Sequence, residues 1–357
     1  MRRLARLAAA AAAIVASLLT LALPAAAVDA RRVVGGLDQP VAFTFDRDGR
    51  IWYVEKDGGE VRVVDPSTDQ DSAFVQVDGV SDQGERGLLG IALHPRYPTE
   101  PFVYVFATRM ANGALRNQVL RFRDRNGTGV EQNVIFSSRA SDSPYHNGGH
   151  IAFGPDGNLY VVVGEGHSPA LAQDRRDDRG KILRVEPNGD VPRTNPFDNR
   201  VWAYGIRNSF GFGFDPQTGR LWETENGPSC NDEINLIKRG RNYGWGPNQT
   251  CQGSAPRNTN QDGPRPVLPE VLYEHPIAVT GIAFCDGCNL GARSEGAAFH
   301  GAANDGRIAR LLLTAHRTGV RMRSIVYDHA GPTLSVEAGP GGRLYFSDFD
   351  SIYVLTR

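Results

Sequence analysis

The sequence lacks an excess of charge of either sign. Its 39 Lys and Arg residues are balanced by 40 Asp and Glu, which gives a formal net charge of −1 at pH 7. Without a basic excess there is no electrostatic basis for binding nucleic acid. Long runs of apolar residues at helical spacing are also absent after residue 30, whereas 41 glycines and 22 prolines supply many turns. This combination predicts a globular, turn-rich all-β protein.

A long hydrophobic run occurs only within the first 27 residues. MRRLAR is basic, LAAAAAAIVASLLTLAL is apolar, and PAAA offers small residues for cleavage, which we expect after Ala27. The apolar run is shorter than the roughly 20 residues of a membrane span, so a secretory signal peptide is favoured over a membrane anchor. Residues 1–27 are therefore predicted to be removed, leaving residues 28–357 as an exported chain without a membrane span.

Cysteine is scarce as well. The four cysteines are Cys230, Cys251, Cys285 and Cys288. An even number in an exported protein indicates disulfides, and neighbours in sequence pair most simply as Cys230–Cys251 and Cys285–Cys288. Zinc is the less favoured alternative, because only one C-x-x-C motif is present.

What the sequence does contain is a repeated glycine turn followed by a short aromatic or β-branched run. The clearest copies are DGRIWYVEK (48–56), DGNLYVVVGE (156–165), TGRLWETENG (218–227) and GGRLYFSD (341–348). Two further units lack this turn but keep the same spacing of short strands, and they start with GLLGIALHP (87–95) and TGIAFCDG (280–287). Six repeats of three or four short strands predict one six-bladed β-propeller of four-stranded antiparallel blades over residues 28–357.

Propellers carry their functional groups on loops at one end of the central channel. Polar insertions are therefore candidates for that end, and they comprise residues 81–87, 141–150, 205–211, 225–233 and 292–306.

A candidate general base lies in SPYHNGGHIAFGPDGNLYVVVGEG (143–166). A general base needs an accessible imidazole, and Asn147 and two glycines leave His146 free of bulky neighbours. A hairpin could return Glu165 to orient the ring. His150 is a weaker candidate, His167 is interpreted as solvent-facing, and a packing role remains the alternative for His146.

Two further segments carry candidate ligand-binding groups. GERGLLGIALHP (84–95) contains Glu85 and Arg86, whose alternative interpretation is an exposed salt bridge. YGIRNSFGFGFDP (204–216) contains Arg207 and Asn208, and arginine offers fixed donors for an anionic or carbonyl-bearing ligand. A strand-capping role for Arg207 remains open.

A candidate cation site lies in ENGPSCNDEINLIKRGRNYGWG (225–246). Calcium takes carboxylate and backbone carbonyl oxygens. The Gly227-Pro228 turn bares carbonyls, and Glu225, Asp232 and Glu233 are close in sequence. A merely solvated acidic loop is the alternative.

In this order the four segments resemble the soluble quinoprotein sugar dehydrogenases, the glucose/sorbosone dehydrogenase family that uses pyrroloquinoline quinone (PQQ). The resemblance extends from about residue 33 to the end of the chain. It implies a six-bladed propeller that oxidises the anomeric carbon of an aldose by hydride transfer to the quinone. It also implies a calcium ion that acts as a Lewis acid on the quinone.

The resemblance implies a role for each motif residue. His146 corresponds to the base, and Glu165 replaces an aspartate that orients it. The residues implied to contact the quinone are Glu85, Arg207 and Asn208. The carbonyls of Gly227 and Pro228 would hold the catalytic calcium, whereas Glu233 and Tyr243 would serve a second, structural calcium.

The chain departs from the family where a lysine and two arginines bind the quinone's carboxylates. The lysine position falls at or near Asn304, and the arginine positions fall near Pro332 and Leu334. Arg293 and Arg307 are the candidates to substitute. Each charge-assisted hydrogen bond contributes about 1.5–3 kcal/mol, so their loss predicts much weaker binding of a trianion.

Three functions therefore compete. The first is an exported PQQ- and calcium-dependent aldose dehydrogenase, with a small sugar as substrate and an unidentified electron acceptor. The second is a degenerate propeller that binds a glycan or a protein. The third is a calcium-dependent hydrolase of the lactonase type, which the backbone-carbonyl pattern of Gly227-Pro228 disfavours.

Overall fold

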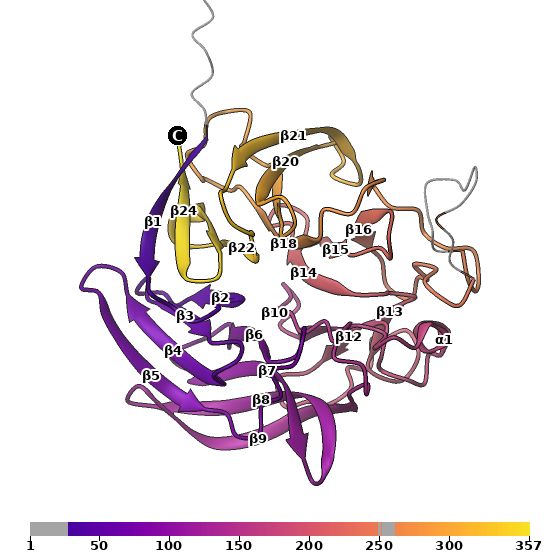
Figure 1. Cartoon of the computed structure of the whole chain (residues 1–357), viewed down its shortest axis with the longest axis horizontal. Helices are drawn as coiled ribbons and strands as arrows, with labels where there is room; N and C mark the ends of the chain where they lie inside the picture. The colour runs from indigo at the N-terminus through magenta and orange to yellow at the C-terminus, as the bar shows by residue number, and fades with distance from the viewer. Residues whose placement is uncertain (1–27, 249–250, 252–260) are drawn as a thin grey trace, which may run out of the picture.

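A computed structural model describes residues 28–248, 251 and 261–357, and the predicted signal peptide lies outside the described residues. Six four-stranded antiparallel sheets surround a central axis, so the predicted six-bladed propeller is confirmed (Figure 1). Within the described part of the chain, no helix has the length and apolarity to cross a membrane.

Each of the first five blades is formed by four consecutive strands. Blade 1 contains β2 (Ala42–Phe45), β3 (Ile51–Val54), β4 (Glu60–Asp65) and β5 (Gln70–Gln76). Blade 2 contains β6 (Leu88–Leu93), β7 (Phe102–Ala111), β8 (Ala114–Arg125) and β9 (Thr128–Arg139). Blade 3 contains β10 (Ile151–Phe153), β11 (Leu159–Val163), β12 (Lys181–Val185) and β13 (Val201–Tyr204). Blade 4 contains β14 (Ser209–Phe214), β15 (Leu221–Glu225), β16 (Asp232–Ile237) and β17 (Val271–Tyr273). Blade 5 contains β18 (Val279–Phe284), β19 (Ala298–Ala302), β20 (Arg307–Leu313) and β21 (Val320–Asp328).

Blade 6 closes the ring with strands from both ends of the described chain. It combines β22 (Ser335–Ala338), β23 (Leu344–Ser347) and β24 (Ser351–Thr356) with β1 (Asp29–Gly35), which pairs antiparallel with β24. The repeat pattern does not reveal β1, because its residues are all exposed or half-buried and lack alternation. Pairing β1 with β24 holds the first and last blades together, as a stable ring requires.

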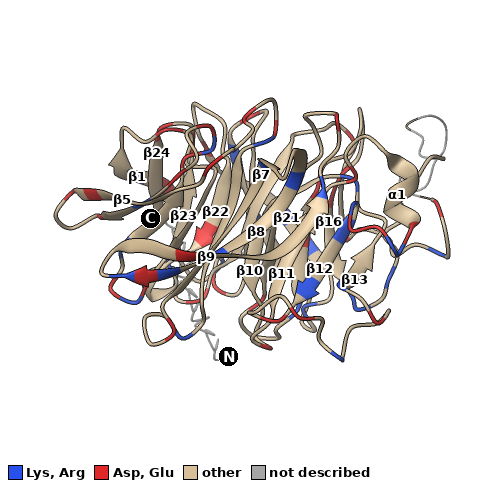
Figure 2. Ribbon diagram, turned by 90° about the horizontal axis from the view of Figure 1, so that it is seen from below, with Lys and Arg blue, Asp and Glu red and all other residues tan. Residues whose placement is uncertain are grey.

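The core lies between adjacent blades. The second strands of blades 1, 3 and 4 read IWYV, LYVVV and LWETE, and every residue in them is buried. The Trp52 ring meets Phe74 of its own blade at a centroid distance of 5.0 Å and Tyr97, which follows β6 of blade 2, at 5.5 Å. Charged side chains lie mainly in the loops at the two ends of the blades (Figure 2).

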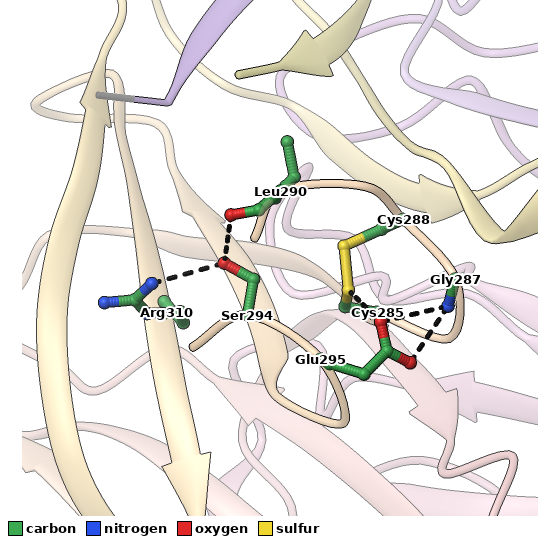
Figure 3. Close-up of a disulfide and its surroundings, with 7 residues drawn as sticks. All are labelled: Cys285, Gly287, Cys288, Leu290, Ser294, Glu295 and Arg310. Carbon is green, nitrogen blue, oxygen red and sulfur yellow. Dashed lines mark hydrogen bonds between the residues drawn. A yellow bond between two sulfur atoms is a disulfide. The ribbon is translucent and has the colours of Figure 1, made fainter. Parts of the chain in front are cut away.

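Both predicted disulfides are present. Cys230 pairs with Cys251 and Cys285 with Cys288, and no described cysteine is free, so the zinc alternative is wrong. The Cys285–Cys288 turn joins β18 to β19, and its Gly287 N–H donates to Glu295 Oε1 at 3.0 Å (Figure 3).

Replacing Trp52 by Ala tests the packing between blades. Trp52 is 1% exposed, so its loss should lower the free energy of unfolding by about 3–5 kcal/mol. Phe349→Ala is the control, because that side chain is 55% exposed and its loss should change stability by less than about 0.5 kcal/mol. Equal effects in denaturant unfolding would contradict this description of the core.

Candidate active site

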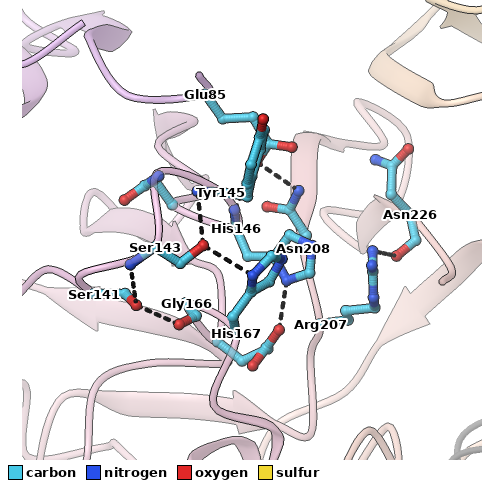
Figure 4. A network of polar contacts seen from close by, with 12 residues as sticks. Glu85, Ser141, Ser143, Tyr145, His146, Gly166, His167, Arg207, Asn208 and Asn226 are labelled. Carbon is cyan, nitrogen blue, oxygen red and sulfur yellow. Dashed lines mark hydrogen bonds and ion pairs between the residues drawn. The ribbon is translucent and has the colours of Figure 1, made fainter. Parts of the chain in front are cut away.

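Four predicted segments meet at one end of the channel. Glu85 precedes β6, His146 precedes β10, and Arg207 and Asn208 precede β14, while Glu165 follows β11. The inner strands begin at this end and the second strands end there, so residues up to 123 positions apart come into contact. Figure 4 shows this network.

The centre of the site is a buried pair formed by His146 and Glu165. His146 Nδ1 lies 2.5 Å from Glu165 Oε1, and the two residues are 7% and 1% exposed. Because a carboxylate only accepts hydrogen bonds, Nδ1 carries the proton and Nε2 is left as an acceptor. The expected contact is present, and its arrangement suits a general base.

Glu85 holds the backbone of His146 in place. Its Oε2 accepts a hydrogen bond from His146 N at 2.7 Å and another from Asn208 Nδ2 at 3.0 Å. His146 has a φ of +59°, an uncommon conformation for a residue other than glycine, which this anchor helps to hold. The exposed salt bridge considered for Glu85 and Arg86 is wrong: Arg86 is buried, and its guanidinium donates to the carbonyls of Ser141 and Asp142.

Arg207 lies beside this pair, just before the start of β14. Its Nη1 donates to Asn226 O at 2.8 Å, and its guanidinium lies 5.2 Å from the centre of the Trp245 ring. Its carbonyl accepts a hydrogen bond from Glu165 N at 2.8 Å. Burial lowers the pKa of Arg207, and the nearby carboxylates of Glu165 and Glu225 partly offset this effect.

Several buried polar atoms in this network have no hydrogen-bond partner among the described residues. They are Glu165 Oε2, Asn147 Oδ1, Arg207 Nε and Asn208 Oδ1. An unsatisfied buried polar group costs about 1–3 kcal/mol, so their concentration in one place indicates a site for a polar ligand.

His167, which the sequence indicated to be solvent-facing, contacts the residues of this site. Its ring meets the His146 ring edge-on at 4.1 Å and stacks on Tyr145 at 5.7 Å. Its Nδ1 lies 2.8 Å from Ser143 Oγ. Partial burial lowers the pKa of His167. His167 is exposed, as expected, but nothing in GEGHS indicated that its ring would contact the base.

The predicted calcium loop has an ordered acidic anchor. Gly227 N donates to Asp232 Oδ1 at 2.8 Å, and Asp232 Oδ2 accepts the N–H groups of Ile277 and Ala278, both at 2.8 Å. Asp232 is thereby occupied in shaping the loop. Among the described residues, no backbone hydrogen bond outside the strands reaches the carbonyl of Gly227 or Pro228.

Glu233 and Tyr243, the residues expected at the second calcium site, contact different residues. Tyr243 donates its hydroxyl to Leu236 O at 2.7 Å, whereas Glu233 Oε2 accepts from Asn235 Nδ2 at 3.3 Å. The same amide nitrogen reaches Glu223 at 3.2 Å and Glu225 at 3.4 Å. Burial raises the pKa of Glu223 and Glu233 to about 8 each. Burial and the acidic neighbours Glu223 and Glu233 also raise the pKa of Glu225 well above its ordinary value. A shared site for Glu233 and Tyr243 stays a prediction.

The opposite side of the channel mouth is formed by blades 5 and 6. The loops 303–306 and 329–334 contain no Lys or Arg. Arg307 lies at this end, but it is half exposed and lies within 4 Å of Asp305 and Asp328. Arg293 follows β18 and precedes β19, which places it at the other end of the channel and excludes it as a substitute.

Fold and site together define a six-bladed β-propeller with a buried histidine–glutamate pair and an Asp232-anchored turn at one mouth of its channel. The family model described as Glucose / Sorbosone dehydrogenase matches residues 37–351. The chain therefore belongs to the glucose/sorbosone dehydrogenase family, which supports an oxidoreductase of the sugar dehydrogenase type.

Three relatives show how this family varies. Quinoprotein glucose dehydrogenase B of Acinetobacter calcoaceticus is 29% identical over 249 residues, covering 61% of this chain and 52% of the relative. The PQQ-bound aldose sugar dehydrogenase of Streptomyces coelicolor has a TM-score of 0.80 and 29% identity, covering 92% and 97% of the two chains. The human Hedgehog-interacting protein is 29% identical over 211 residues, covering 49% of this chain and 30% of that protein.

The buried carboxyls predict a pH dependence of stability. The pKa of Glu223 is about 8 in the folded chain and near 4.5 when unfolded, so folding favours the protonated form. Between these values only the unfolded chain releases the proton, and stability falls as pH rises. Glu223→Gln should therefore become more stable relative to the parent between pH 5 and pH 8.

Thermal unfolding with a calcium chelator measures this difference. Glu131→Gln is the control, because Glu131 lies in an exposed ion-pair network on blade 2 and should show no such trend. A constant difference between Glu223→Gln and the parent across this range would contradict the prediction.

Proposed function

We propose that the protein is an exported oxidoreductase that uses PQQ and calcium to oxidise the anomeric carbon of aldose sugars. The observation that carries this proposal is the buried His146–Glu165 pair, which leaves Nε2 of the imidazole as a proton acceptor. Membership of the family supports the reaction class. The predicted signal peptide and the two disulfides support export.

The residues present fit the reactive end of the cofactor. The unpartnered Nε of Arg207 and the Nδ2 amide of Asn208 are donors suited to quinone oxygens, and the carbonyls of Gly227 and Pro228 are suited to calcium. When bound, the quinone would supply the hydride acceptor and calcium would polarise its carbonyl.

The chain's own residues handle the proton. His146 Nε2 would accept it from the anomeric hydroxyl as hydride leaves the same carbon, and the sugar would become a lactone. Glu165 holds the ring in the required tautomer and stabilises the imidazolium that forms, because its carboxylate stays against Nδ1. Its burial strengthens that interaction by excluding water.

The residues present do not fit the carboxylate end equally well. Blades 5 and 6 provide Arg307, which faces two aspartates, where a trianion would need several unpaired cations. We therefore expect the protein to hold PQQ weakly and to need an excess of it for activity.

Reconstitution tests the proposed function. The purified mature chain with added PQQ and calcium should reduce an artificial electron acceptor with glucose or arabinose. His146→Asn should lower kcat by about 10²–10⁴-fold, because it removes the base while tolerating the left-handed backbone. The control, His316→Ala, alters an exposed loop at the other end and should leave turnover unchanged.

Thermal unfolding of the same variants separates chemistry from folding. An unchanged melting temperature with lost turnover supports His146 as the base. Full turnover in His146→Asn would contradict this role, and no turnover in the parent over a panel of aldoses would contradict the proposed activity.

A second candidate function is a propeller without catalysis that binds a glycan or a protein. The absence of Lys and Arg from loops 303–306 and 329–334 favours it, and the relative named Hedgehog-interacting protein is consistent with it. Calorimetric titration distinguishes the two. Calcium binding with no heat from PQQ at millimolar concentration would support this second candidate, whereas calcium-dependent PQQ binding would contradict it.

A further inference from the structure

The channel has a cavity at the end opposite the candidate active site. All six inner strands end there, after starting at the active-site end, and Figure 1 shows them around the axis. Their last residues are Phe45, Leu93, Phe153, Phe214, Phe284 and Ala338, and all of them line this cavity of about 830 Å³. None of Glu85, His146, Glu165 and Arg207 lines it.

One position in the repeat differs sharply between blades. The residue before the last one of each inner strand also lines the cavity, and these residues are Thr44, Ala92, Ala152, Gly213, Ala283 and Glu337. Five blades thus place a small side chain at this position, and blade 6 places a carboxylic acid. Since the blades repeat one structural unit, Glu337 is a carboxyl added at a position whose equivalents carry no charge.

Glu337 has no ion-pair partner among the described residues. Its Oε1 accepts a hydrogen bond from Ser335 Oγ at 3.1 Å, and burial raises its pKa to about 8. The Asp46 carboxylate, elsewhere on the wall, forms an ion pair with Arg50 and accepts a hydrogen bond from Trp52 Nε1. His150 is kept uncharged, because burial lowers its pKa to about 4.

The remaining charged groups of this wall lie at its rim. Arg47 and Asp286 are both exposed, and they balance each other in formal charge. His94 also lines the cavity, and burial lowers its pKa. Glu337 is therefore the acidic group of the inner wall that no described side chain neutralises, and a bound cation would favour its ionised form.

Aromatic rings complete the wall around this carboxyl. Phe45, Phe153 and Phe214 are half-buried and line the cavity from three different blades. The faces of aromatic rings attract organic cations, and an enclosed carboxylate pairs with a positive charge. An inorganic divalent ion fits poorly, because such ions require several oxygen ligands and the phenyl rings offer none.

We propose that this end of the channel is a binding site for a small organic cation with an apolar or aromatic body, in which Glu337 pairs with the positive charge and the phenylalanine rings contact the body. This site is separate from the candidate active site and does not depend on its activity. A neutral or anionic molecule would leave Glu337 without its partner.

Calorimetric titration of the mature chain with benzyltrimethylammonium tests the proposal. We expect saturable binding at one site per chain, and affinity at least tenfold weaker in Glu337→Gln, which keeps the shape and removes the charge. Benzyl alcohol and benzenesulfonate should bind at least tenfold more weakly than the cation. Glu131→Gln, with its carboxyl on the outside of blade 2, should bind as the parent does.

Two outcomes would overturn the proposal. One is unchanged affinity in a Glu337→Gln variant that keeps the parent's melting temperature. The other is equal affinity for the cation and for benzyl alcohol. Phe214→Leu provides a second variant that retains an apolar wall, and an affinity loss there with normal unfolding supports the aromatic contribution.

Discussion

The hydrogen bond between His146 and Glu165 is the interaction on which the chemistry of this site depends. It favours a proton on Nδ1 and leaves Nε2 as an acceptor, which suits the base role proposed for His146. Glu165 can reach the ring because β11 ends where the loop before β10 lies, and Glu85 holds the backbone of His146 from a neighbouring blade. Closure of the ring by β1 and β24 keeps the blades that supply these residues in place.

The two sides of the channel mouth differ in how well they suit the family's cofactor. The strands and loops of blades 2, 3 and 4 supply the proposed base, its partner, Arg207, Asn208 and the Gly227-Pro228 turn. Blades 5 and 6 supply no lysine and one arginine that faces aspartates. Under the proposed function, this difference predicts that cofactor affinity, rather than the base, limits activity.

The six blades and both disulfides could be predicted, because glycine turns and alternating strands recur locally and the cysteines pair with their neighbours in sequence. The contact between His146 and Glu165 could be expected from a hairpin. The strand β1 could not, because its exposed residues carry no alternation. His167, Glu223 and Glu337 escaped notice because their roles depend on contacts between strands, or on comparing equivalent positions in different blades.

The tautomer of His146 tests the central claim most directly. Nitrogen-15 NMR of the imidazole at neutral pH should show Nδ1 protonated and Nε2 unprotonated in the parent protein. Glu165→Gln should weaken or abolish this preference, because its amide can also donate to the ring. A proton on Nε2 in the parent, or the same spectrum in Glu165→Gln, would contradict the assignment of His146 as a base oriented by Glu165.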